Sequence, residues 1–157
     1  MWICALHCKI RLAMLTCDIG YLLKKPVGTR QSFDIDEKVH LNDSDGLVLT
    51  ENVTGRVQLI KLPHEISVSL NNLHTIAESG CSRCIRRFSS SIDIESAERE
   101  FIIDLPERDL TKDEDVFYIN KKTNRIELDD MIRDEILLHF PPIPVCSESC
   151  KGLCDKC

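Results

Sequence analysis

Six cysteines lie at spacings typical of metal ligands. They are Cys81, Cys84, Cys146, Cys150, Cys154 and Cys157. Two of the intervals have the form Cys-x-x-Cys, a tight turn that lets both sulfurs face one ion. Gly80 and Gly152 come before these two turns and would supply the backbone freedom that the turns require. Because thiolates hold zinc tetrahedrally, two such pairs in one chain predict at least one structural Zn²⁺ site.

The four places of one tetrahedral site cannot take all six cysteines, so some are spare unless two ions share ligands. For a single site, two arrangements are open. In the first, Cys81 and Cys84 join Cys154 and Cys157 and tie the C-terminal tail to the rest of the fold. In the second, the four tail cysteines close a site among themselves. Either site is structural rather than catalytic, since four thiolates leave no open position for a water molecule.

The alternative interpretation of a Cys-x-x-Cys pair is a cytosolic thiol-redox protein or a redox-regulated chaperone. That function requires a lowered thiolate pKa and no tightly bound metal. Other catalytic patterns are weak, because the histidines are scattered, the glycines form no phosphate-binding loop and no nucleophile pattern stands out. A nuclease would need a cluster of catalytic carboxylates, which the pattern does not show. We therefore expect a protein that is not an enzyme and has no small-molecule substrate.

Positive charge lies beside the first cysteine pair. Arg83 is inside the turn, and Arg86, Arg87 and Phe88 follow it. Such a patch can bind phosphates or stack on a base, so these arginines are candidate RNA contacts. The other interpretation is that they neutralise thiolate charge and pair with acidic strands.

The net charge of −6 argues against a protein that coats nucleic acid through a generally basic surface. The charge is unevenly distributed. Residues 1–30 contain five basic residues and one acid, a balance of +4, whereas residues 92–135 contain fifteen acids and seven bases, a balance of −8. The acidic region either keeps the protein in solution or forms a docking surface for a basic partner.

The nine cysteines are best explained by a reducing compartment. Lys9 and Arg11 interrupt the apolar N-terminal stretch where a signal peptide needs an unbroken apolar region. No uncharged apolar run reaches the roughly 20 residues that cross a bilayer. We therefore expect a cytoplasmic protein without a membrane partner.

Two kinds of element must position these groups. Between residues 33 and 103 apolar residues alternate, which predicts an antiparallel meander of about five or six strands with one face buried. Pro63 and His64 mark one turn, and Asn71 and Asn72 a second. Residues 120–124 are expected to join two strands, 116–119 and 125–128, as a hairpin.

An amphipathic helix is predicted after these strands. The residues at helical spacing are Leu128, Met131, Ile132, Ile136 and His139 or Phe140. Asp129 and Asp130 suit its first turn, and Pro141 and Pro142 end it. The fold class is α+β: an antiparallel β-meander, one C-terminal amphipathic helix and a zinc-knuckle tail. We divide the chain into an extension or mis-called start at 1–13, an α+β domain at 14–145 and a cysteine-rich tail at 146–157.

Several segments together resemble the YceD family. In order, they are residues 81–85 (CSRCI), 126–141 (IELDDMIRDEILLHFP), 143–146 (IPVC) and 150–157 (CKGLCDKC). Residues 22–28 (LLKKPVG) are also similar to the N-terminal segment of that family. The likeness covers nearly the whole chain from Met14 onward.

The resemblance implies a role in accumulation of large-subunit ribosomal RNA, through its processing or through assembly of the large subunit. Members of the family are commonly encoded beside a small zinc-binding ribosomal protein. The implied partners are therefore the rRNA precursor and a small basic ribosomal protein. In this hypothesis the acidic surface holds the basic protein and the arginines beside the first cysteine pair touch the RNA.

Overall fold

The computed structural model describes residues 15–42, 45–103, 117–119 and 123–153. Its strands are β1 (Thr16–Asp18), β2 (Arg30–Glu37), β3 (Leu47–Leu49), β4 (Val53–Lys61), β5 (Glu65–Gly80), β6 (Arg87–Ile102), β7 (Phe117–Tyr118) and β8 (Arg125–Glu127), and its helices are α1 (Gly20–Leu23) and α2 (Asp129–His139). The predicted extension at 1–13 lies outside the described residues. Within the described ranges, no helix combines the length and the apolarity needed to cross a membrane.

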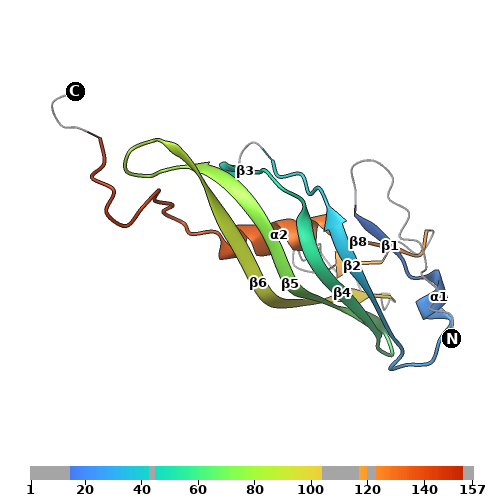
Figure 1. The fold of residues 1–157 in the computed structure, drawn as a ribbon. Coiled ribbons are helices and arrows are strands. Elements are labelled where there is room, and N and C mark those ends of the chain that lie inside the picture. Colours follow the sequence, from blue (N-terminus) through green and yellow to red (C-terminus); the bar gives the residue numbers. More distant parts are fainter. Residues whose placement is uncertain (1–14, 43–44, 104–116, 120–122, 154–157) are drawn as a thin grey trace, which may run out of the picture.

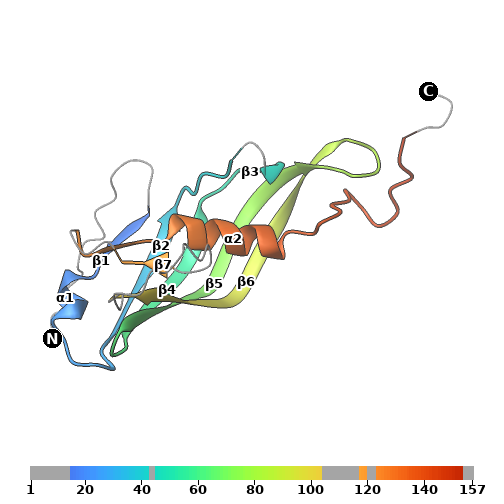
Figure 2. The ribbon, with the colours of Figure 1, turned by 180° about the vertical axis from the view of Figure 1, so that it is seen from behind.

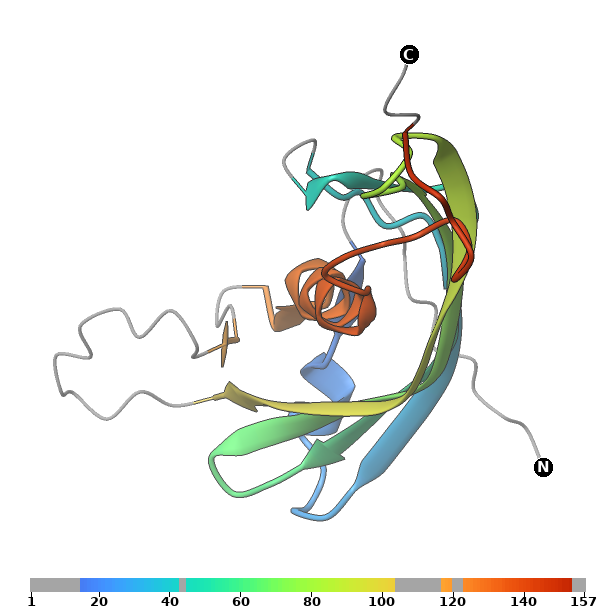
Figure 3. The ribbon, with the colours of Figure 1, turned by 90° about the vertical axis from the view of Figure 1, so that its left-hand side faces the viewer.

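The predicted α+β class is confirmed. β2, β4, β5 and β6 form an antiparallel meander, with β3 paired to the end of β5 and β7 added in parallel to β6. The sheet is strongly curved, and α2 lies in its concave side (Figure 3). β5 and β6 have 16 residues each, so their hairpin extends beyond the shorter strands (Figure 1).

The helix forms where the apolar spacing predicts it. Met131, Ile132 and Ile136 are fully buried, and Arg99 of β6 donates to the carboxylates of Asp134 and Glu135 at 3.2 Å each. Phe140, before the two prolines, is in an extended conformation with φ −76° and ψ 133°, which ends the helix. The helix is thus fixed to the sheet both by apolar burial and by an ion pair to β6.

The turn predicted at Asn71 and Asn72 is wrong. Both residues lie inside β5, where the register against β4 shifts between Thr54 and Arg56. Asn72 has φ 50°, a left-handed conformation that asparagine tolerates better than most residues. The extra residue forms a bulge, so the strand continues and bends instead of reversing.

The predicted hairpin around 120–124 is also wrong. β7 pairs in parallel with the end of β6, while β8 pairs antiparallel with β1 in a separate two-stranded sheet. Ile126 of β8 is completely buried and lies opposite Cys17 of β1. The two short strands were correctly located, but they pair with β6 and β1 and not with each other.

Gly55 makes the bulge of β5 possible, because Leu73 occupies the space where a side chain of β4 would lie. A Cβ at position 55 would be 2.6 Å from Leu73 Cδ2 and 3.0 Å from the carbonyl oxygen of Asn72. We predict that Gly55→Ala lowers the free energy of unfolding by about 1–3 kcal/mol, the usual cost of overpacking. Gly80→Ala is the matched control, since a Cβ there meets nothing within 4 Å. Chemical denaturation measures both, and equal stability of the two variants would contradict the packing argument.

Candidate metal centre

The tip of the β5–β6 hairpin is a tight loop that contains the first cysteine pair. The backbone N–H of Cys81 donates to the carbonyl of Arg86 at 2.8 Å, and that of Ile85 donates to the carbonyl of Cys81 at 2.9 Å. The left-handed position of this loop is Ile85, with φ 62°. Gly80, expected to supply this freedom, instead ends β5 in extended pairing with Arg87.

The C-terminal arm, residues 140–153, runs from α2 to the hairpin tip (Figures 1 and 2). The backbone N–H of Ser82 donates to the carbonyl of Pro144 at 2.8 Å. Arg83 reaches across with its guanidinium and donates to the carbonyls of Glu148 and Cys150, both at 3.3 Å. The arm is therefore fixed to the loop by polar contacts on both sides of its first cysteine.

Four sulfurs meet between the loop and the arm. They belong to Cys81, Cys84, Cys146 and Cys150, and all lie within 4.8 Å of one another. The Sγ atoms of Cys81 and Cys150 are 3.8 Å apart, and those of Cys84 and Cys146 are 3.7 Å apart. Four sulfurs placed tetrahedrally about 2.3 Å from one ion would be separated by about 3.8 Å. The cluster therefore has the dimensions of a four-thiolate metal site.

This combination differs from both arrangements that we predicted from the sequence. The first pair meets Cys146 and Cys150, the two cysteines that are not part of a Cys-x-x-Cys turn. Cys154 and Cys157 lie outside the described residues. The missed signal is the short proline-containing arm, because it brings the first two tail cysteines to the hairpin tip directly after the helix.

The pKa values of the Cys81 and Cys146 thiols shift in opposite directions. The pKa of Cys81 is lowered to about 6, chiefly because the backbone N–H of Cys146 donates to its sulfur at 3.4 Å. Burial opposes this shift, and the N–H of Arg83, also 3.4 Å from that sulfur, supports it. The pKa of Cys146 is raised to about 12, first by the neighbouring thiol of Cys150 and then by burial. The Cys81 thiolate is favoured and the Cys146 thiolate is opposed, unless a cation neutralises the charge.

The three arginines of the loop have different environments. Arg83 is engaged with the arm, and Arg87 forms an ion pair with Glu78 of β5. Arg86 is exposed, and its side chain makes no hydrogen bond or ion pair with any residue in the described part of the chain. Arg86 is therefore the arginine of the patch that is most available to a partner.

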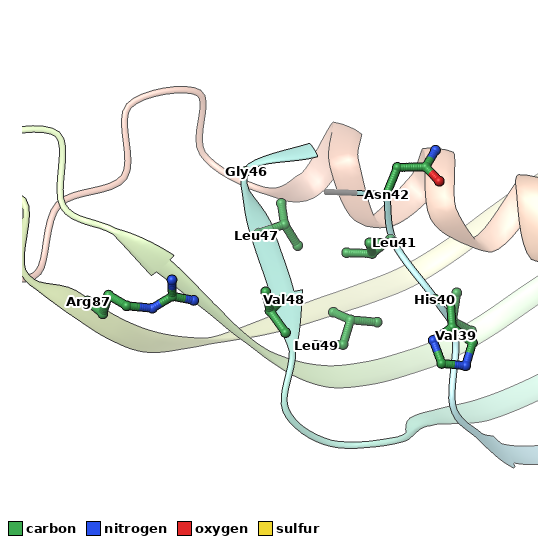
Figure 4. Close-up of a pocket in the computed structure, with 9 residues that line it drawn as sticks. All are labelled: Val39, His40, Leu41, Asn42, Gly46, Leu47, Val48, Leu49 and Arg87. Atoms are coloured by element: carbon green, nitrogen blue, oxygen red, sulfur yellow. The ribbon is translucent and has the colours of Figure 1, made fainter. Parts of the chain in front are cut away.

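A second hollow lies beside β3. The residues around it are Val39, His40, Leu41, Asn42, Gly46, Leu47, Val48, Leu49 and Arg87 (Figure 4). Among these lining residues, His40 and Arg87 are the ionisable ones, and Arg87 is paired with Glu78. The hollow offers no nucleophile and no paired acid and base, so the cysteine cluster remains the candidate site.

Comparison with known families agrees with the resemblance seen in the sequence. Residues 71–157 match the family model described as large ribosomal RNA subunit accumulation protein YceD. The match includes β6, α2, the arm and the six candidate cysteines. No curated protein and no solved structure matched the chain.

Ile85 tests the loop geometry, because a β-branched residue is strained at positive φ. The side chain is 71% exposed, so its removal loses little buried surface. We predict that Ile85→Gly raises the free energy of unfolding by about 1 kcal/mol through relief of this strain. Ile85→Val keeps the branched Cβ and serves as the control with unchanged stability. Thermal unfolding of samples with equal metal content measures the stability of both variants. If Ile85→Gly were less stable than Ile85→Val, the strain at position 85 would be refuted.

Proposed function

Because the chain belongs to the YceD family of large ribosomal RNA subunit accumulation proteins, we propose that it acts in ribosome biogenesis as a zinc-stabilised binding module and not as an enzyme. The observation that carries the proposal is the meeting of four sulfurs from the hairpin tip and the arm. A site filled by four thiolates stabilises structure and leaves no position for a reacting water. Its contribution is to hold a surface in place.

Zinc is the ion that this donor set favours. Soft thiolates in tetrahedral arrangement select Zn²⁺ or iron–sulfur chemistry over hard cations such as Mg²⁺. Two backbone N–H groups already point at the sulfur of Cys81, which is the support that a thiolate ligand needs. Bound Zn²⁺ would offset the mutual repulsion of the remaining thiolates and tie the arm to the hairpin.

Metal stoichiometry tests the assignment of ligands. We predict one zinc per chain in protein purified without chelator, and its loss in Cys84→Ser and in Cys146→Ser. The double variant Cys154→Ser/Cys157→Ser should keep one zinc per chain, since the other four cysteines fill a tetrahedral site. Elemental analysis combined with thiol titration measures both quantities. Cys17→Ala controls for the loss of a thiol that lies outside the cluster.

The same measurement separates the zinc module from a thiol-redox protein. A redox protein would contain far less than one zinc per chain and would expose a reactive thiolate in the purified state. That outcome would refute the zinc proposal. Retention of zinc by Cys84→Ser would refute the proposed ligand set while leaving a metal elsewhere in the chain.

Two partners follow from the charge distribution. Arg86, with Arg83 and Arg87 beside it, would contact phosphates of the large-subunit rRNA precursor. The acidic surface would attract a small basic ribosomal protein before that protein reaches RNA. The metal would link the two functions, because the arginines lie on the loop that the cluster stabilises.

Complementation tests the role in rRNA accumulation. In cells that lack this protein, the wild-type chain should restore the ratio of large- to small-subunit rRNA. Crosslinking in the same cells should recover large-subunit precursor with the wild type and several-fold less with Arg86→Ala. Arg30→Ala removes an exposed arginine at the start of β2 and should behave as wild type.

Failure of the wild type to change the rRNA ratio would refute the role itself. Equal crosslinking of the two arginine variants would refute the RNA contact alone.

A further inference from the structure

The outer edge of β6 is unpaired over most of its length. β6 pairs with β5 from Arg87 to Ile102, whereas on its other side β7 pairs with Phe101 and Ile102 alone. Within the described ranges, no backbone group forms a hydrogen bond to the outer side of residues 87–100. The arm passes the Arg87 end of the strand on its way to the hairpin tip (Figures 1 and 2). The stretch from Asp93 to Glu100 is therefore a strand edge to which no described segment of the chain pairs.

Known hydrogen bonds show which residues point their backbone outward. In an antiparallel pair, bonded and non-bonded residues alternate. The bond from Cys81 N–H to Arg86 makes the odd-numbered residues of the first half of β6, including Asp93, point away from β5. Beyond the bulge the alternation reverses, since Ile103 N–H donates to His64 of the β4–β5 turn and Ile119 N–H donates to the outward carbonyl of Ile102. In the second half, the even-numbered residues point outward.

The side chains of these outward residues are exposed and acidic. They are Asp93, Glu95, Ser96, Glu98 and Glu100. Asp93 contacts His74 at 2.6 Å and Glu98 accepts from Ser67 at 2.5 Å, so both carboxylates are held in the row. Arg99, the base of this stretch, turns instead to α2. The edge therefore combines free backbone groups with four carboxylates on one exposed row.

We propose that residues 93–100 of β6 bind an extended, lysine- or arginine-rich segment of a partner protein by strand addition. The partner's backbone would pair with the free edge, and its alternate basic side chains would lie opposite the carboxylates. The charges exclude other occupants. A second copy of this edge would place acids against acids, and RNA phosphates would be repelled. The inference rests on the basic protein partner of the proposed function and gives it a binding site, and it requires neither zinc nor RNA.

A synthetic nine-residue peptide that alternates lysine and valine is a suitable probe. It carries the charge and the β-propensity of the proposed partner, and fluorescence anisotropy measures its binding to the full-length protein. A second peptide has the same sequence with every backbone amide N-methylated, so it keeps the charge but has no backbone N–H to donate to an edge. We expect the methylated peptide to bind at least about tenfold more weakly, because strand addition depends on main-chain hydrogen bonds.

Two protein variants separate backbone pairing from charge. Ser96→Pro removes an outward N–H and leaves the pairing with β5 intact, so it should weaken binding, whereas Ser96→Val keeps the N–H and should bind as wild type. Glu95→Lys/Glu100→Lys should raise the Kd about tenfold. Glu51→Lys/Glu127→Lys makes the same charge change at two exposed acids away from this edge and is the matched control. Thermal unfolding confirms that each variant is folded.

Equal binding of the methylated and unmethylated peptides would overturn strand addition. Equal effects of the two double lysine variants would overturn the location. Absence of peptide binding at low salt would overturn the proposal as a whole. None of these results affects zinc content or rRNA accumulation, so the failure of this inference is distinguishable from the failure of the proposed function.

Discussion

Four thiols in one small space are the constraint on which this molecule depends. Two come from a hairpin tip and two from an arm more than 60 residues later in the chain. Without a cation, the thiolate of Cys81 is favoured and that of Cys146 is opposed by its neighbours and by burial. With a cation bound, each thiolate is attracted to the positive charge, so the four sulfurs can lie close together. The charge state of the cluster and the position of the arm are therefore coupled, because a bound cation would affect both.

The rest of the fold explains how these two segments come together. The bulge at Asn72 bends the β5–β6 hairpin, and Gly55 provides the space for Leu73 beneath it. The helix is held in the concave side, with Arg99 pairing to Asp134 and Glu135. Its C-terminal end is thereby directed toward the hairpin tip, so a short arm is enough to reach it (Figures 1 and 2).

Local patterns predicted the elements well and their partners poorly. The meander, the helix with Met131, Ile132 and Ile136 inward, and its end at the prolines follow from periodicity and proline sterics. The bulge could not be predicted, because two asparagines suit a turn and a bulge equally well. The choice of ligands also escaped prediction. Spacing identifies residues able to bind a metal, but which of them meet depends on where the arm lies against the hairpin.

A metal-mediated link between the arm and the hairpin tip would affect how the protein unfolds. A metal bound by Cys81 and Cys150 would join residues that are 69 positions apart, and so close a ring of chain that contains β6, β7, β8 and α2. Such a cross-link reduces the freedom of the unfolded chain, as a disulfide over a long loop does. β1 to β5 lie before the ring begins, so this cross-link does not constrain them directly. Thermal fraying would therefore start in the N-terminal half, while the ringed C-terminal half keeps its shape.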